Sequence, residues 1–286
     1  MSGIVAGMDY SLLFSPSSAS QASTNILNIL YNPAAQTAGQ SSFVSTGNPL
    51  LDLKLAQQDE SADVAKEQLQ PQVMQAITAF TTAISKSTSI SQALGNPEVQ
   101  QVLLTANGLS NYIGQTALVQ KVMMSDPNDP TSLVNQLGDS QLTSAVQTYN
   151  FGQNGLAELQ NPMIQQTLAS GYAQAMWLQS LDQATPGLSN AITFLGQASQ
   201  IKSSADILDN ITNFDVVTTA LGIPQAIINQ PLAAQQQAID SRLDYAKLQD
   251  PNYVSSLTDQ YLLTMQENNT SSTTNTGAAS VLNLFA

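Results

Sequence analysis

The chain of 286 residues contains no cysteine and no histidine, and it has seven Lys and Arg residues against 20 Asp and Glu residues. Without cysteine it can form no disulfide, no thiolate nucleophile and no Cys-ligated metal site. Without histidine it lacks the commonest general base and metal ligand, which excludes Ser-His and Cys-His catalysis and the zinc motifs that need histidine. We therefore expect no enzymatic activity and no cofactor.

The net charge of −13 excludes two further classes of partner. A protein that binds nucleic acid neutralises a run of phosphates with Lys and Arg, and docking on anionic lipid needs the same cations. No apolar stretch approaches the roughly 18 residues of a transmembrane helix, so we expect no membrane span. Protein partners are the class that remains.

Charged residues make up only 9% of the chain, against about 25% in an average globular domain. Gln, Asn, Ser and Thr supply the polarity instead. Such a neutral surface suits broad hydrogen-bonded contacts with other proteins. A lineage bias in amino-acid usage would produce the same composition, and the sequence leaves both interpretations open.

The first 13 residues contain no Lys or Arg, and Asp9 and Ser11 interrupt their apolar run. We therefore expect no secretory signal peptide. The lack of cysteine fits an oxidising compartment, or passage of the unfolded chain through an export channel. The predicted location is a surface appendage or another extracytoplasmic site, reached without a cleavable signal; the alternative is the cytoplasm.

Two segments, 1–47 and 267–286, are rich in small and polar residues and are predicted to be flexible in the free chain. Both also contain short apolar clusters, which solvated tails do not need. We expect these clusters to fold against a protein partner. The candidate partner-binding residues are Leu12, Leu13, Phe14, Ile26, Leu27, Ile29, Leu30, Tyr31, Val281, Leu282, Leu284 and Phe285.

The centre of the chain, 48–266, is predicted to be helical. Its recurring signal is a capping residue followed by proline, because Asn or Asp accepts from the free N–H groups of a first helical turn while proline there loses no hydrogen bond. The pairs are Asn48-Pro49, Asn96-Pro97, Asp129-Pro130, Asn161-Pro162, Thr185-Pro186 and Asp250-Pro251.

Apolar residues after these starts recur at helical spacing, as in Leu118, Val119, Val122 and Met123. Alternating patterns typical of strands are nearly absent. The β-branched cluster at 214–219 is short, and we interpret it as the start of a buried helix. The predicted fold is an all-α helical bundle with weakly structured termini.

Two stretches, about 96–149 and 209–266, resemble each other and predict a three-helix unit used twice. In each, a helix ends at a glycine with a left-handed cap, a second helix follows, and an Asp-Pro-Asn turn caps a third. The matched positions are Thr105 to Leu109 with Thr219 to Ile223, and Asp126-Pro127-Asn128 with Asp250-Pro251-Asn252.

Few side-chain groups suggest chemistry. Asp126 and Asp129, with Asn128 between them, could hold a hard cation, but they lack the glycine and distal Glu of an EF-hand loop. We favour a turn in which both residues cap helices. Asp240 and Asp244, one turn apart, could act as an acid–base pair, although a solvated helix face is the more usual meaning.

Two other features have a structural and a functional interpretation. Arg242, the only arginine, could anchor a buried or interfacial ion pair or be a plain surface cation, and we favour the surface cation. Trp177, with Tyr172, Met176 and Leu181, could line a binding pocket. Core packing is the interpretation we favour, because aromatic residues at helical spacing usually fill an interior.

Residues 96–268 resemble a little-characterised family of bacterial proteins, mostly alphaproteobacterial, whose genes often lie among flagellar genes. The likeness is carried by Val102 to Leu104, Gly108-Leu109, Leu118 to Val122, Phe214 to Pro224, Ile239 to Leu243 and Leu248 to Tyr253. The resemblance implies association with the flagellum, with export through its secretion channel. The ends lack the long heptad stretches of paired axial helices, so the resemblance does not extend to a rod, hook or filament subunit.

The leading hypothesis is a non-enzymatic structural or assembly component of the flagellum or a similar appendage, which contacts itself or other components through its ends. The alternative is a monomeric helical module that binds a small molecule or peptide beside Trp177. A carboxylate-based enzyme is the third hypothesis and would require Asp and Glu residues clustered in a deep pocket.

Overall fold

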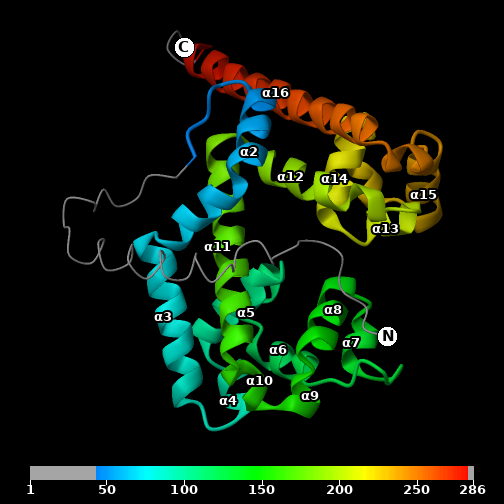
Figure 1. Ribbon diagram of the computed structural model, residues 1–286. Coiled ribbons are helices and arrows are strands. Elements are labelled where there is room, and N and C mark those ends of the chain that lie inside the picture. Colours follow the sequence, from blue (N-terminus) through cyan, green and yellow to red (C-terminus); the bar gives the residue numbers. More distant parts are fainter. Residues whose placement is uncertain (1–42, 283–286) are drawn as a thin grey trace, which may run out of the picture. The chain divides into compact units, whose positions relative to one another are not determined.

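The computed structural model describes the backbone of residues 43–282 and the side chains of residues 43–269. Helices are the only regular secondary structure in this part of the chain, which confirms the predicted all-α class (Figure 1). None of these helices is long and apolar enough to cross a membrane.

The chain divides into two compact units, where the sequence predicts one domain over 48–266. Of the described residues, unit 1 contains 43–60 and 180–282, and unit 2 contains 61–179. Two helices contribute residues to both units, α2 (Pro49–Gln68) and α11 (Pro162–Ala184).

Unit 1 is a set of short helices packed on one long helix. After α2 and the end of α11, its elements are α12 (Leu188–Gln197), η4 (Ala198–Gln200), α13 (Ser204–Leu208), α14 (Ile211–Ala220), η5 (Gln225–Asn229), α15 (Leu232–Asp240), η6 (Tyr245–Gln249) and α16 (Pro251–Leu282). Helices α12 and α14 pack on α16 and on each other. Because α16 continues to Leu282, its helical backbone passes well beyond residue 266, where the sequence analysis ended the helical region.

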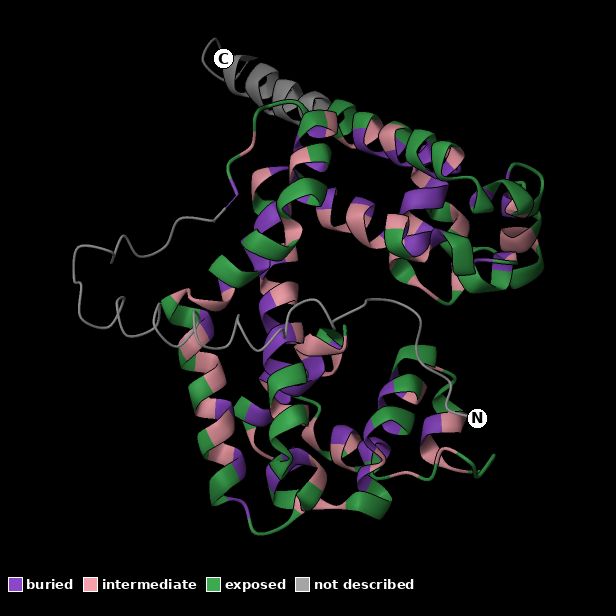
Figure 2. Cartoon of the chain, in the orientation of Figure 1, coloured by how far each residue is buried: buried purple, intermediate pink, exposed green. Residues whose placement is uncertain are grey.

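Unit 2 is built from the rest of the helices. They are α3 (Pro71–Lys86), α4 (Ile90–Leu94), α5 (Pro97–Ala106), η3 (Ser110–Tyr112), α6 (Thr116–Met123), α7 (Leu133–Leu137), α8 (Ser140–Tyr149), α9 (Phe151–Asn154) and α10 (Leu156–Gln160), followed by most of α11. Helix α3 packs along α5, and α6 packs against α8. Phe80 and Trp177 are fully buried in this unit, and buried positions line the inner faces of the helices (Figure 2).

Helix starts follow the predicted capping chemistry at four of the six sites. The Asn96 side chain accepts from the backbone N–H groups of Glu98 and Val99 at 2.9 and 3.3 Å, and Asn48, Asn161 and Asp250 cap α2, α11 and α16 in the same way. The prediction is wrong at Asp129-Pro130 and Thr185-Pro186. Helix α7 begins only at Leu133 and α12 at Leu188, so these two prolines lie in turns.

Helices α4 and α5 of unit 2 correspond to α13 and α14 of unit 1, with every start and end displaced by 114 residues. The serine that caps α4, Ser89, has its counterpart in Ser203 before α13. Helices α5 and α14 also begin after matching asparagines, whose side chains accept from backbone N–H groups of the first turn.

Helices α5 and α14 also end in the same way. Gly108 and Gly222 have φ angles of +71° and +62°, the left-handed conformation that the sequence predicts. In both units the residue after the glycine then donates its backbone N–H to a carbonyl in the last turn of the helix. Leu109 donates to Leu104 and Ile223 donates to Thr218, each at 2.8 Å.

The correspondence stops after α6 and α15. Asp250 caps a helix of 32 residues, whereas Asp126 opens a turn in which it accepts from the N–H and Nδ2 groups of Asn128. The prediction that Asp126 caps a third helix is therefore wrong, because the chain makes a second turn at Asp129 before α7 begins.

Gly187, just before α12, is a site where only glycine fits both the backbone and the packing. Its φ angle is +86°, and an added Cβ would lie 2.8 Å from the hydroxyl oxygen of buried Tyr261. We expect Gly187→Ala to lower the free energy of unfolding by about 2 kcal/mol or more, since the left-handed backbone alone costs an alanine roughly 1–2 kcal/mol. Urea unfolding followed by circular dichroism measures this change.

Gly222→Ala is the matched control, because Gly222 also has a positive φ but no atom within 4 Å of an added Cβ. It should lose only the backbone contribution of about 1 kcal/mol. Equal losses in the two variants would show that the approach of Tyr261 to Gly187 contributes nothing.

Candidate functional site

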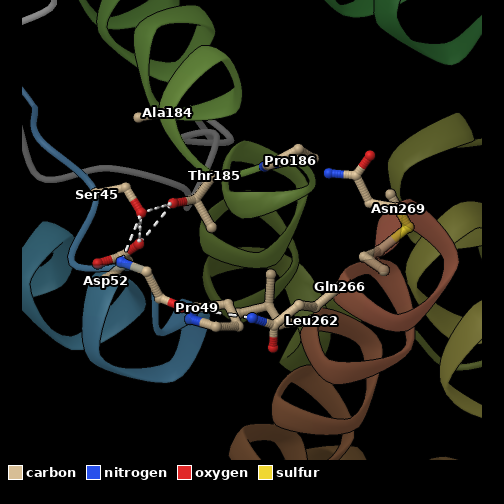
Figure 3. Close-up of a pocket in the computed structure, with 11 residues that line it drawn as sticks. Ser45, Pro49, Asp52, Ala184, Thr185, Pro186, Leu262, Gln266 and Asn269 are labelled. Atoms are coloured by element: carbon tan, nitrogen blue, oxygen red, sulfur yellow. Dashed lines mark hydrogen bonds between the residues drawn. The ribbon is translucent and has the colours of Figure 1, made fainter. Parts of the chain in front are cut away.

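A pocket of about 170 Å³ lies in unit 1, where the segment before α2, the end of α11 and the middle of α16 meet (Figure 3). Three stretches of the chain, far apart in sequence, supply its walls. The lining residues are Ser45, Gly47, Pro49, Asp52, Ala184, Thr185, Pro186, Leu262, Met265, Gln266 and Asn269.

Asp52, in the first turn of α2, is fully buried at the polar side of this pocket. Its carboxylate accepts hydrogen bonds from the hydroxyls of Ser45 and Thr185, both at 2.5 Å, and from the hydroxyl and N–H of Thr46 at 2.6 and 2.8 Å. Figure 3 shows the Ser45 and Thr185 side chains converging on this one carboxylate. Both oxygens of the Asp52 carboxylate accept hydrogen bonds, and these bonds offset the cost of burying its charge.

These hydrogen bonds also determine the protonation state of Asp52. Burial by itself raises the pKa of the carboxyl, but the donors from Ser45, Thr185 and Thr46 outweigh it and bring the pKa below its ordinary value of 3.8. Asp52 is therefore ionised at neutral pH, with its oxygens already occupied. It anchors residues 45–46 to the end of α11, and it is not placed to act as a general base.

The opposite wall of the pocket is apolar and the rim is neutral. Pro49, Leu262 and Met265 form much of the wall, and Gln266 on the rim donates to the carbonyl of Gly47 at 3.4 Å. None of the lining residues is Lys or Arg. The volume is below the roughly 300–1,000 Å³ of typical small-molecule sites, and suits one or two apolar side chains.

A second polar cluster of unit 1 surrounds the Tyr261 hydroxyl. Tyr261 donates to Asp215 at 3.1 Å, and the amide of Asn190 donates to the same carboxylate oxygen at 3.0 Å. Burial raises the pKa of Tyr261, and the nearby carboxylates of Asp215 and Asp182 raise it further, so the hydroxyl keeps its proton. The cluster joins α12, α14 and α16 and holds them in register.

The carboxylates that the sequence analysis considered for chemistry serve as local caps. Asp129 accepts from the N–H and hydroxyl of Thr131 at 2.8 and 2.7 Å, and Asp244 accepts from the N–H of Ala246 at 3.1 Å. Asp240 accepts from the hydroxyl of Tyr245. Across the described residues, no group of three or more acidic side chains gathers as a metal site would require. Asp126 and Asp129 hold turns, and the expectation that both would cap helices is wrong, because the next helix begins only at Leu133.

Arg242 and Trp177 take the structural roles that the sequence analysis favoured. Arg242 is exposed and donates to the carbonyl of Ala238 at 3.0 Å, at the end of α15. Trp177 is fully buried together with Leu181, and Tyr172 is 5% exposed. The patch is therefore core packing and does not line the pocket.

Most of the predicted partner-binding residues lie outside the described part of the chain. These are Leu12, Leu13, Phe14, Ile26, Leu27, Ile29, Leu30, Tyr31, Leu284 and Phe285. Val281 and Leu282 end α16, and their side chains are also outside the described set. Their role stays a prediction.

Sequence reasoning missed Ser45, Thr185 and the whole pocket. Asp52 stood out only as an acidic residue in a first helical turn, where the helix dipole favours it. No local pattern links it to Thr185, which lies 133 residues away. Only the fold brings these groups together.

The comparisons with known proteins show a family and a related fold. A crystal structure of a protein from Agrobacterium tumefaciens is similar to this chain at 20% identity and a TM-score of 0.64, covering 83% of this chain and all of that one. At this identity the likeness shows the fold alone. Nothing among the curated proteins matches. The family described as protein of unknown function (DUF1217) matches residues 106–254, more than half of the sequence, and the chain belongs to this family.

Proposed function

We propose that this protein is a non-enzymatic structural or assembly component of the bacterial flagellum or a similar surface appendage. It would act through protein–protein contacts of its two ends, with copies of itself or with other components of the appendage. The proposed route to the surface is export without a cleavable signal peptide. The flagellar part of the proposal rests on the family resemblance found in the sequence.

The observation that carries the structural role is the use of acidic side chains within the described residues. Asp52 binds three neighbouring residues, Asp215 joins three helices, and Asp129 and Asp244 cap turns. Carboxylates used in this way stabilise a rigid body, because their lone pairs are already taken. A rigid body with apolar clusters on its ends can fold those ends on a partner.

The paired helices α4–α5 and α13–α14 support a second element of the proposal, a structural unit used twice in the chain. Equal helix bounds, matching Ser and Asn caps and the same closing hydrogen bond after Gly108 and Gly222 all favour it. A duplicated helical body would offer two similar surfaces to an assembly.

A chain lacking residues 1–42 and a chain lacking residues 283–286 test the role of the ends. In sedimentation velocity over a hundredfold range of concentration, we expect the full chain to form larger species than either shortened chain. The reason is that an apolar cluster gains about 25 cal/mol for each Å² that a partner covers. Circular dichroism checks that the shortened chains keep their helices.

Equal sedimentation of full and shortened chains would contradict the proposal. The alternative, a monomeric helical module for a small molecule or peptide, predicts a monomer at all concentrations whose melting temperature rises with ligand. The small volume of the unit 1 pocket favours a side chain of a protein partner over a cofactor-sized ligand.

A further inference from the structure

We propose that the pocket of unit 1 receives the apolar C-terminal residues, Leu284 and Phe285, of a second copy of this chain. This inference rests on the proposed function and names one partner and one site for it. The pocket is defined above by its lining residues, which come from 45–52, 184–186 and 262–269.

The chemistry of the pocket matches that of the C-terminal segment. Pro49, Leu262 and Met265 provide an apolar surface, and Gln266 and Asn269 provide neutral amides beside it. The segment 270–286 has no charged side chain and ends with the sequence Val-Leu-Asn-Leu-Phe-Ala. Asp52 is the one charged side chain of the lining, and its oxygens already accept from Ser45, Thr46 and Thr185. A segment without charged side chains can therefore enter beside the apolar wall without placing a second carboxylate side chain against Asp52.

The size of the pocket also fits. About 170 Å³ is room for one or two large side chains, and Gly47 in the lining adds no side chain to the wall. Burial of one Leu or Phe side chain strengthens binding by roughly tenfold to a hundredfold. One such contact is weak, and closure of a head-to-tail ring strengthens it because every copy is then held by two contacts.

The occupant must come from another molecule, because the same chain cannot reach back. Helix α16 continues for 13 residues from Asn269, the last lining residue, to Leu282. At 1.5 Å per residue this carries the chain about 20 Å away from the pocket. Leu284 and Phe285 follow Leu282 by two and three residues, which span at most about 11 Å when fully extended.

Leu284 and Phe285, here called the tip, cannot reach the pocket of their own molecule, so the tip of one copy and the pocket of the next form a head-to-tail contact. Such a contact is heterologous, so it leaves an open pocket at one end and an open tip at the other. Copies then add on to form a closed ring or an open filament. The apolar clusters of residues 12–14 and 26–31 differ from the C-terminal residues in their reach. They precede Ser45, a lining residue, by a short length of chain, so they can reach the pocket of their own molecule.

Engineered cysteines test the pairing directly, because the chain has none of its own. One full-length chain carries Met265→Cys and a second, tagged to change its mass, carries Phe285→Cys. We expect a disulfide-linked heterodimer under a mild oxidant. Leu263→Cys replaces Met265→Cys in the control, since Leu263 lies two residues away on α16, is 44% exposed and does not line the pocket.

Equal yields of heterodimer from positions 263 and 265, or no heterodimer from either, would overturn the proposal. A chain carrying both Met265→Cys and Ile29→Cys tests the competing occupant. A disulfide within that one molecule, formed in preference to the pairing with position 285, would assign the pocket to the chain's own N-terminal cluster and would also overturn it.

Charge substitutions separate the failure of this inference from the failure of the proposed function. Met265→Glu and Phe285→Glu should each weaken self-association by about tenfold or more, because each buries an unpaired charge, while Leu263→Glu should not. Met265→Glu keeps intact C-terminal residues and Phe285→Glu keeps an intact pocket. A mixture of these two variants should therefore form dimers but no larger species. Self-association that needs the ends yet ignores Met265→Glu would refute the pocket and leave the proposed function standing.

Discussion

Replacement of Asp52 by alanine is expected to lower the free energy of unfolding of unit 1 by about 3 kcal/mol. The substitution removes the acceptor of the hydroxyls of Ser45, Thr46 and Thr185 and of the Thr46 N–H group. Hydrogen bonds to a charged group contribute roughly 1.5–3 kcal/mol, and buried donors left without an acceptor cost more than the bond itself. Urea unfolding followed by circular dichroism measures the loss.

Asp59→Ala is the matched control, because Asp59 lies on the same helix α2 and is exposed. Its expected change is within about 0.5 kcal/mol. Similar values for Asp52→Ala and Asp59→Ala would show that the carboxylate at the pocket does not anchor the segment before α2.

The pH dependence provides a second test of Asp52. Its pKa in the folded chain is lowered from the ordinary value of 3.8, so its stabilisation is fully present above that value and is lost as the pH falls through the folded pKa. The difference in stability between the natural chain and Asp52→Ala should therefore be constant near neutral pH and shrink below about pH 4. A difference that grows on acidification would contradict the lowered pKa.

Replacement of Trp177 by alanine is expected to lower the free energy of unfolding of unit 2 by about 3–5 kcal/mol, as is usual for a large aromatic side chain removed from a core. Trp177 is fully buried in α11, beside Tyr172 and Ala173 at helical spacing. The loss comes from the apolar surface returned to water and from the cavity that the helices cannot close. Urea unfolding followed at 222 nm measures it, since the variant has no tryptophan fluorescence.

Met163→Ala provides the comparison on the same helix. Met163 is 71% exposed, so its truncation should change the stability by less than about 0.5 kcal/mol. If the two variants unfolded at the same urea concentration, Trp177 would not be part of the core of unit 2.

Local features of the fold could be predicted because neighbouring residues decide them. Asn96 and Asp250 cap their helices with a side chain that needs only the next turn of backbone. Gly108 and Gly222 end theirs because a residue without a Cβ adopts a positive φ at little cost. The helical class followed in the same way from apolar spacing. These predictions are correct because the interactions close within a few residues.

Two features that sequence analysis missed depend on distant contacts. Thr185 was expected to cap a helix at Pro186, but its hydroxyl donates to Asp52 and the helix starts two residues later, after Gly187. The two compact units could not be predicted either, since α2 and α11 continue without a break in their pattern across residues 60 and 180. The packing of other helices sets that division.

The sequence by itself determined the all-α class, four helix starts, two left-handed helix ends and the exclusion of histidine and cysteine chemistry, because each depends on residue type or on neighbours within one or two turns. Only the tertiary structure decided that Asp52, Thr185 and Met265 share one pocket. These residues come from helices that approach one another because they bury apolar faces together. That burial is a property of the whole packed unit, and no single stretch of sequence contains it.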